Sequence, residues 1–389
     1  MTAPRGRFLV IFLTVFIDLV GFGIVIPILP YYAERMGVAG LGFGALIGVF
    51  SLAQFVATSV LGRLSDRVGR RPVLLASILL GAAGYVAFAL AATYPVLLAA
   101  RVIAGFAAGN ISVAQAYIAD ISSPGERSRR MGLVGAAFGL GFIVGPALGG
   151  IAGHYGGPMA AGLVAAGLCV VNFVSALVIL DESLHAERRV TRRLLDAEHL
   201  VKGLRDPMLR PPFVVFAVIP FAFSGYMVAL PLYAERAFGW AERELGWFFT
   251  IVGIIAATVQ GYLFGKLARR TGDRILTVAG MLGMAAAIAA VPFLGSAALL
   301  YASVVVLAFS NSITSPAITG IISSLTVASE QGAMLGAAQS LTALGRFSGP
   351  FLFGAVYDRV GARAAFLAAG AVMAVGWLVS FGIREAAPE

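Results

Sequence analysis

Charged side chains are scarce in this chain of 389 residues. Asp, Glu, Lys and Arg make up 12% of it, whereas apolar residues make up 59%. A soluble protein of this length usually folds as two or three cores and carries about a quarter of its residues as these four types. So few charges cannot cover the surface of a soluble fold. The composition therefore argues against a soluble enzyme and predicts an all-α integral membrane protein.

Cysteine is nearly absent as well. Cys169 is the single copy, so neither an intrachain disulfide nor a thiolate metal cluster is expected. The sequence contains no GxxxxGK[ST] phosphate-binding loop and no HExxH helix. We therefore expect no metal site, no cofactor and no enzymatic activity.

The formal charge of +9 does not indicate nucleic acid, because the Lys and Arg residues are not gathered on one face or helix. They lie in short gaps between apolar segments and favour alternate gaps, as in proteins that retain positive charge on the cytoplasmic side. Met1 to Arg7 superficially resembles the start of a signal peptide, but without a convincing cleavage site we interpret the following run as a first span. Both termini are then cytoplasmic, and the outer gaps hold only Arg35, Arg236, Arg243, Arg359 and Arg363.

Apolar windows of about 20 residues, the length that crosses a bilayer as a helix, recur along the whole chain. They predict twelve transmembrane helices: Phe8 to Ala33, Gly42 to Leu61, Val73 to Ala92, Pro95 to Ala119, Met131 to Gly153, Pro158 to Leu180, Pro212 to Ala234, Leu245 to Leu267, Ile275 to Phe293, Ala297 to Leu325, Ala333 to Val356 and Ala364 to Phe381.

Three motifs occur twice, at an offset of a little over two hundred residues. PYYAER from Pro30 returns as PLYAER, GRLSDRVGRR from Gly62 returns as GKLARRTGDR, and LGFIVGPAL from Leu140 returns as LGRFSGPFL. Such repetition predicts two pseudo-symmetric six-helix bundles that enter the membrane from the same side, with substrate sites between the halves. The predicted domains are an N-terminal bundle at 1–180, a charged cytoplasmic linker at 181–210 and a C-terminal bundle at 211–389.

Three charges lie within the predicted spans, where a charge is costly and by default indicates function. Asp18 is a candidate for proton coupling or substrate binding, or else a structural acceptor for a neighbouring helix. Arg101 either extends to the outer interface or pairs with an acid or carbonyl and shifts that acid's proton affinity. Arg346, whose counterpart in the repeat is Phe142, either faces a cavity or forms structural hydrogen bonds.

Uncharged polar residues in spans usually hydrogen-bond neighbouring helices, but a few can face a cavity. Gln54 and Asn311 are the preferred candidates among them, and Gln260 is a further polar residue of this kind. Aromatic residues such as Phe16, Phe22, Phe221, Phe309 and Phe347 pack or line an apolar pocket. The complete set of cavity candidates is Gln54, Asn110, Gln115, Tyr226, Asn311 and Gln339.

Span five carries glycines spaced four apart, which form a bare stripe where another helix can approach closely. The stripe is either ordinary tight packing or a smooth seam for two rocking halves, and Pro146 adds a kink. Its residues are Gly141, Gly145, Pro146, Gly149 and Gly150, followed by Gly153.

The basic loop after span two is either a topology signal or an ionic latch that closes the cytoplasmic side. In the second case Asp66 accepts from the arginines or from a nearby helix N-terminus. The predicted gate consists of Gly62, Asp66, Arg67, Gly69, Arg70 and Arg71.

These segments resemble the major facilitator superfamily, and within it the twelve-span bacterial drug:proton antiporters, over nearly the whole chain. GRLSDRVGRRPVL from Gly62 resembles the signature of the loop between spans two and three. RVIAGFAAGNISVAQAYIADIS from Arg101 resembles the fourth-span motif, whose arginine is implicated in proton coupling. GLGFIVGPALGG from Gly139 resembles the fifth-span antiporter motif, and DLVGFGIVIPILP from Asp18 resembles the first-span motif of drug exporters.

The first half is most similar to the tetracycline exporters, which carry a further acid in span three where this chain has Gly84, and one in span nine where it has none. One embedded acid and two arginines fit a neutral or anionic amphipathic compound at least as well as a multivalent cation. The resemblance thus implies the major facilitator fold and a monomeric, proton-coupled antiporter that exports amphipathic small molecules or drugs by alternating access across a bacterial inner membrane. The alternatives are a proton-linked or facilitative importer of a sugar or other nutrient, and a membrane receptor or enzyme on a transporter frame.

Overall fold

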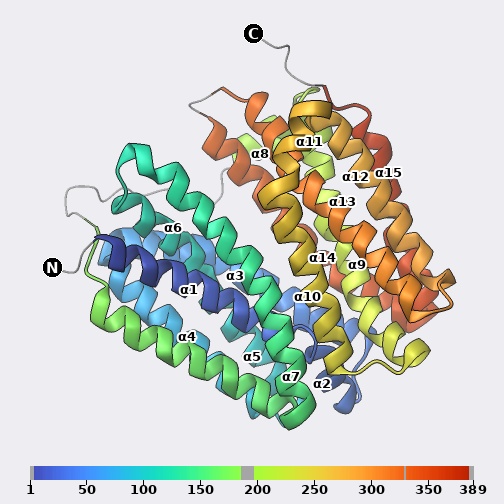
Figure 1. Ribbon diagram of the computed structural model, residues 1–389, viewed down its shortest axis with the longest axis horizontal. Helices are drawn as coiled ribbons and strands as arrows, with labels where there is room; N and C mark the ends of the chain where they lie inside the picture. Colours follow the sequence, from blue (N-terminus) through green and yellow to red (C-terminus); the bar gives the residue numbers. More distant parts are fainter. Residues whose placement is uncertain (1–3, 185–196, 328–329, 385–389) are drawn as a thin grey trace. The chain divides into compact units, whose positions relative to one another are not determined.

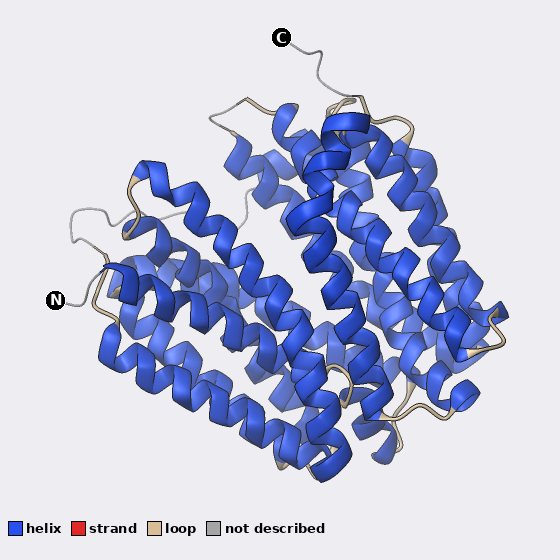
Figure 2. Ribbon diagram, in the orientation of Figure 1, coloured by secondary structure: helices blue, strands red, loops and turns tan. Residues whose placement is uncertain are grey.

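The computed structural model describes residues 4–184, 197–327 and 330–384. Within these ranges every regular element is a helix (Figure 2). Helices are expected here, because a segment in hydrocarbon must satisfy its own backbone hydrogen bonds. Part of the predicted linker, residues 185–196, lies outside the described residues.

Ten helical segments of the described residues are long and apolar enough to cross a membrane. One of them, Leu133–Ile179, has 47 residues, about 70 Å of helix against a hydrocarbon core of about 30 Å. Its backbone breaks at Gly157, where φ is 64°, so it can account for both the fifth and the sixth predicted span. The eleventh predicted span lies in a helix outside these ten, and the count of twelve stays a prediction.

The chain divides into two compact units (Figure 1). Unit 1 comprises 1–38, 49–194 and 240–253, and unit 2 comprises 39–48, 195–239 and 254–389. Two helices are therefore shared, since α3 begins in unit 2 and α10 begins in unit 1. The units are thus discontinuous in sequence, and the domains at 1–180, 181–210 and 211–389 stay a prediction.

Unit 1 is built around the long helix α7, with α1 packed along it and α4 beside its second half. Thr14 of α1 donates to Asn172 of α7 across 3.0 Å, the kind of interhelical polar contact that holds membrane helices together. Pro27 and Pro30 fall where the first predicted span breaks into α1 and α2. The elements of unit 1 are α1 (Pro4–Val25), α2 (Leu29–Arg35), most of α3 (Gly40–Val68), α4 (Arg70–Ala89), α5 (Tyr94–Ala107), the 3₁₀ turn η1 (Ala108–Asn110), α6 (Ile111–Asp120), α7 (Pro124–Ile179) and the start of α10 (Glu242–Thr258).

Unit 2 pairs α14 with α9, and packs α12 against α13 and α15. The short helix α8 is tied to the region before α14 by an ion pair in which Lys202 donates to Glu330. This hydrogen bond holds the pKa of the exposed Glu330 carboxyl below its ordinary value. The remaining elements are α8 (Ala197–Arg205), α9 (Arg210–Phe238), the π-helix η3 (Val259–Leu263), α11 (Phe264–Thr271), α12 (Asp273–Ala290), η4 (Val291–Phe293), α13 (Ala297–Ser324), α14 (Gln331–Val360) and α15 (Ala362–Ser380).

The duplication is visible as the same packing in both units. In unit 1, a Cβ at Gly246 would lie 2.7 Å from the carbonyl oxygen of Pro146. In unit 2, Gly44 approaches the carbonyl of Pro350 in the same way. Pro146 and Pro350 occupy matching positions of the duplicated fifth-span motif. The prediction of two pseudo-symmetric bundles is thereby confirmed at the level of side-by-side helices.

Candidate functional site

The embedded acid of unit 1 is paired with an amide. Asp18 lies on α1, and the Asn110 side chain at the end of η1 forms a hydrogen bond with its carboxylate. Asn110 is 1% exposed. The Oδ2 atom of Asp18 and the Oδ1 atom of Asn110 are both buried without a hydrogen-bond partner among the described residues. This pair therefore holds two acceptors that no donor satisfies.

A tyrosine, an arginine and the single cysteine surround this pair. Tyr85 of α4 is buried and lies within electrostatic range of Asp18, Arg101 and Cys169. Its hydroxyl packs against α1 at Gly21, where a Cβ would come within 2.5 Å of it. The cluster thus combines side chains from α1, α4, α5, η1 and α7.

Arg101 is held inside the protein. It is 4% exposed, and its guanidinium lies 4.3 Å from the centre of the Phe50 ring, a favourable cation–π distance. The alternative that its side chain extends to the membrane interface does not describe this structure. Phe50 also packs against Phe22, with ring centres 5.1 Å apart.

Sequence reasoning found Asp18, Asn110 and Arg101 but not Tyr85 or the place of Cys169 beside Asp18. A tyrosine in an apolar span is ordinary, and nothing in its spacing distinguishes Tyr85 from packing residues. The helix break at η1, which carries Asn110, also has no clear signal in the sequence beyond the adjacent Gly109.

The other cavity candidates are dispersed. Gln54 of α3 is half-buried and its Nε2 lies 3.5 Å from the carbonyl oxygen of Ala108, whereas Gln115 of α6 is exposed. Tyr226 of α9 is 1% exposed, and its hydroxyl has no partner in the described part of the chain. Asn311 of α13 is half-buried, and Gln339 of α14 is exposed.

Arg346 lies in the middle of α14 and is exposed. It has no hydrogen-bond or ion-pair partner within residues 4–184, 197–327 and 330–384. It therefore differs from Arg101, which is enclosed by its own unit.

The predicted gate forms an ion-pair cluster at the start of α4. Arg70 is 8% exposed and contacts the Asp66 carboxylate at 2.6 Å and the Asp120 carboxylate at 3.2 Å. It also donates to the Ser65 hydroxyl at 2.6 Å. Asp120 was not among the predicted gate residues, because it directly follows the fourth predicted span, far from the basic loop in the sequence. All these contacts lie within unit 1.

A third carboxylate, that of Glu182, binds the N-terminus of α4. It accepts from the backbone N–H of Arg70 at 2.8 Å and of Arg71 at 3.2 Å. Gly69 precedes the helix with φ of 112°, a left-handed conformation that favours glycine. Arg71 also donates to the carbonyl oxygen of Leu177, whereas Arg67 is exposed and Gly62 half-buried.

The glycine stripe of α7 is a packing surface for α1. A Cβ at Gly145 would lie 2.8 Å from the Cα of Gly23, and one at Gly149 would lie 2.8 Å from the Cα of Ile24. Gly141 meets Leu19 in the same way, and Gly150 faces the start of α10 at Gly246. The stripe thus brings α7 into backbone contact with two helices of its own unit.

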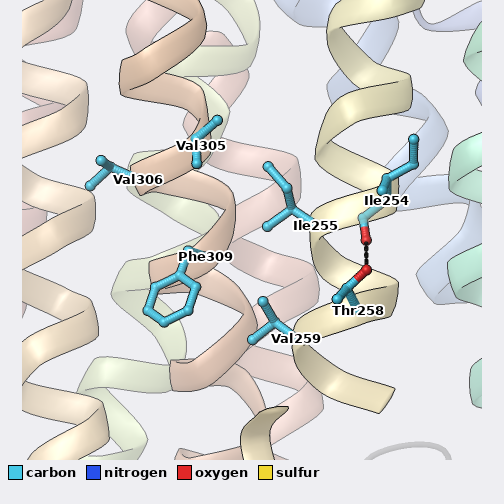
Figure 3. A pocket seen from close by; sticks show the side chains of 7 residues that line it. All are labelled: Ile254, Ile255, Thr258, Val259, Val305, Val306 and Phe309. Atoms are coloured by element: carbon cyan, nitrogen blue, oxygen red, sulfur yellow. Dashed lines mark hydrogen bonds between the residues drawn. The ribbon is translucent and has the colours of Figure 1, made fainter. Parts of the chain in front are cut away.

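An apolar cavity of about 410 Å³ lies in unit 2, between α10 with η3 on one side and α13 on the other (Figure 3). Thr258 contributes a polar group, but its hydroxyl already donates to the carbonyl oxygen of Ile254 at 2.8 Å. The lining is otherwise apolar, so the cavity has no charged side chain that would orient a polar ligand. Its lining is Ile254, Ile255, Thr258, Val259, Val305, Val306 and Phe309.

No group of three or more His, Cys, Asp or Glu side chains in the described residues is arranged to hold a metal ion. The site is thus one of embedded single charges and their polar neighbours.

The chain matches the family model of the Major Facilitator Superfamily over residues 11–263 and 212–389. It is 34% identical to "Tetracycline resistance protein, class C" of Escherichia coli, over 91% of this chain and 90% of that protein. It is 30% identical to "Multidrug resistance protein 2" of Bacillus subtilis (strain 168), over 95% and 93%. Among solved structures, the human organic anion transporter MFSD10 (TETRAN) superposes with a TM-score of 0.71 at 25% identity, over 98% of this chain and 100% of that one.

These matches, together with the helical fold and embedded charges, define a multi-pass membrane transporter of small molecules. The chain belongs to the Major Facilitator Superfamily. The resemblance inferred from its motifs is confirmed, and so is the prediction that it is a transporter and not an enzyme.

Proposed function

We propose that the protein is a proton-coupled antiporter that exports amphipathic small molecules by alternating access. The observation that carries the proposal is the Asp18–Asn110 pair. A carboxylate within a span is costly, and a proton on Asp18 would remove its charge. The same proton would supply a donor in a place where Asp18 Oδ2 and Asn110 Oδ1 are both unsatisfied. Asp18 can therefore exist in a charged and a neutral form, as a proton carrier must.

Arg101 is placed to modulate this exchange. Both Arg101 and Asp18 act electrostatically on Tyr85, so Arg101 belongs to the same charged cluster. A cation in this low-dielectric setting favours the ionised carboxylate. A movement of α5 relative to α1 would thus change how readily Asp18 releases its proton.

The relatives support export as the direction. The printed names of two of them refer to resistance to tetracycline and to several drugs, which fits outward transport of small molecules. The glycine stripe of α7 supplies a smooth surface along which helices can shift. In this proposal the energy source is the proton gradient across a bacterial inner membrane, no cofactor takes part, the protein acts as a monomer and both termini are cytoplasmic. The Asp66–Arg70–Asp120 cluster serves as the inner latch.

Asp18→Asn tests the proposal in proteoliposomes that contain a trapped pH-sensitive dye. Addition of tetracycline, ethidium or fluorescein to wild-type vesicles with an imposed pH gradient should move protons for at least one compound. The Asn variant should lose proton movement almost completely while remaining folded and inserted. Glu330→Gln, which neutralises an exposed acid outside the spans, is the matched control and should behave as wild type.

Retention of full proton-driven transport by Asp18→Asn would refute the assigned role of Asp18. Uptake of a sugar or another nutrient in the inward direction, without any counterflow of protons, would instead favour the importer.

A further inference from the structure

Arg346 is an exposed charge midway along α14 without a counter-ion among the described residues. It is the sixteenth residue of the 30-residue helix α14, roughly 20 Å from either end at 1.5 Å per residue. An arginine side chain cannot cover that distance to reach the interface. Among the residues that the structure describes it has no ion-pair or hydrogen-bond partner. A charge midway along a membrane helix is costly, and an anion from outside the chain would offset that cost.

Two neighbours of α14 show where Arg346 points. On one side α9 packs against Gly345 and Gly349, which face Ala217 and Phe221. On another side the start of α3 packs against Pro350 and Gly354. With 100° per residue, these two contact directions lie on either side of Arg346. Arg346 therefore projects into the angle between α9 and the start of α3.

The apolar exposed residues of α14, which are suited to contact lipid, lie on other sides of the helix than Arg346. Leu344 and Leu352 are each 49% exposed and lie about 160° and 120° around the helix from Arg346. Gln339, two turns before Arg346, lies within about 20° of it and is exposed too. A guanidinium and an amide thus share one face, which is distinct from the apolar exposed face.

No acid lies midway along the described helices α9, α12, α13 and α14 of unit 2. The carboxylate nearest along α14 is Asp358, about 18 Å further on, and it accepts from the backbone N–H of Leu41 at 2.7 Å. The helix α13 contains no charged residue at all, and the Asp and Glu residues of α9 and α12 lie within a turn of their ends. Aromatic rings are close in sequence on the same helix, where Phe347 packs against Phe351 with ring centres 5.3 Å apart.

We infer that the transported compound is an amphipathic anion whose acidic group binds Arg346, with Gln339 as a second donor and aromatic rings beside its apolar body. This inference rests on the proposed function and names its substrate class. A guanidinium binds a carboxylate or sulfonate through two parallel hydrogen bonds. The headgroup of an anionic lipid shares this chemistry, but the position of Arg346 midway along α14 favours a mobile compound over a headgroup at the membrane surface.

The test compares two fluorescent dyes of one ring system, anionic fluorescein and cationic tetramethylrhodamine methyl ester. Binding to the purified protein is measured by fluorescence anisotropy, in detergent and in phosphatidylcholine nanodiscs that contain no anionic lipid. The wild type should bind fluorescein more tightly than the cation. Arg346→Gln should weaken fluorescein binding about tenfold or more and leave binding of the cation unchanged or stronger.

Further variants separate the site from general effects. Arg346→Lys should keep part of the fluorescein affinity, because the charge remains while the two-pronged geometry is lost. Gln339→Ala should weaken binding a few-fold. Arg363→Gln removes one positive charge of the same unit at the start of α15, where Arg363 stacks on Phe293, and should bind as wild type. Each variant is first shown to be monodisperse by size-exclusion chromatography.

The inference is overturned if the wild type prefers the cation or binds neither dye, or if Arg346→Gln and Arg363→Gln weaken fluorescein equally. Complete displacement of fluorescein by added phosphatidylglycerol, whose headgroup carries the same kind of charge, would assign the site to lipid. Because binding is measured without a gradient, these outcomes are independent of Asp18→Asn, which tests proton coupling alone.

Discussion

The two units share their packing but not their charges. The offset that separates PYYAER from PLYAER matches Asp18 of unit 1 with Ile219 of unit 2. In the duplicated fifth-span motif the positions are reversed, with Phe142 in unit 1 and Arg346 in unit 2. Three glycines of the motif, Gly141, Gly145 and Gly150, recur in unit 2 as Gly345, Gly349 and Gly354, whereas Gly149 is replaced by Phe353. The fold thus constrains the seams, while each unit has been free to acquire a different embedded charge. We connect the acid with the proton and the arginine with the substrate.

The shared seam gives the largest expected effect. Gly145→Val would place a branched side chain against the backbone of Gly23, 2.8 Å from the new Cβ, and we expect almost complete loss of folded protein in detergent. Gly145→Ala should cost about 1–3 kcal/mol. Gly349→Ala in unit 2, whose Cβ would lie 2.7 Å from the carbonyl oxygen of Phe221, should destabilise in the same direction.

Gly167→Ala on the same helix α7 is the matched control. A Cβ there meets nothing within 4 Å, so its thermal stability should be unchanged or higher, since alanine is the better helix former. Tolerance of alanine at Gly349 together with intolerance at Gly145 would break the claim of equivalent seams.

The duplicated loop gives the second effect. Arg70→Ala would leave Asp66 and Asp120 without their shared cation. Because both carboxylates are about one quarter exposed, we expect a loss of about 2 kcal/mol, less than for a fully buried pair. Arg269, an exposed arginine of the second loop copy, is the comparison, and Arg269→Ala should change stability by less than about 0.5 kcal/mol. Thermal unfolding in detergent, followed by tryptophan fluorescence, measures both. Equal losses of stability in the two variants would show that Arg70 contributes no more to folding than Arg269 does.

Much of this arrangement could be read from the sequence, and the limits have physical causes. The glycine seam was predictable because glycines four apart have few uses in a membrane helix, whereas its partners α1 and α10 became visible only in the structure. The break at Gly157 was harder to place, since no charged loop separates the fifth and sixth predicted spans. Arg101 looked as though it could reach the interface, because the sequence does not show that Phe50 covers it.

Contacts between distant segments were the least predictable. Tyr85 and Cys169 approach Asp18 only through the packing of α4 and α7 on α1, and no local pattern reports this. Glu182 follows the sixth predicted span with the appearance of an ordinary solvent-exposed acid. Its binding to the start of α4 depends on where two chain segments more than a hundred residues apart emerge from the bundle.

Glu182 gives the smallest effect and the finest comparison of the two units. Both α4 and α12 begin after a glycine of positive φ, Gly69 and Gly272, and a negative charge near such a helix N-terminus is stabilising. Unit 2 supplies it from within, because Asp273 is the first residue of α12, at the position where unit 1 has Arg70. In unit 1 the first residue of α4 is Arg70, so the negative charge at this helix N-terminus comes from Glu182, which lies in a distant chain segment.

We expect Glu182→Gln to lower stability by about 0.5 kcal/mol and Glu182→Ala by about 1 kcal/mol. The loss for Gln should shrink in high salt, because it removes a charge while keeping an acceptor. A loss as large as that of Arg70→Ala, or one insensitive to salt, would mean that Glu182 acts through something other than the helix terminus.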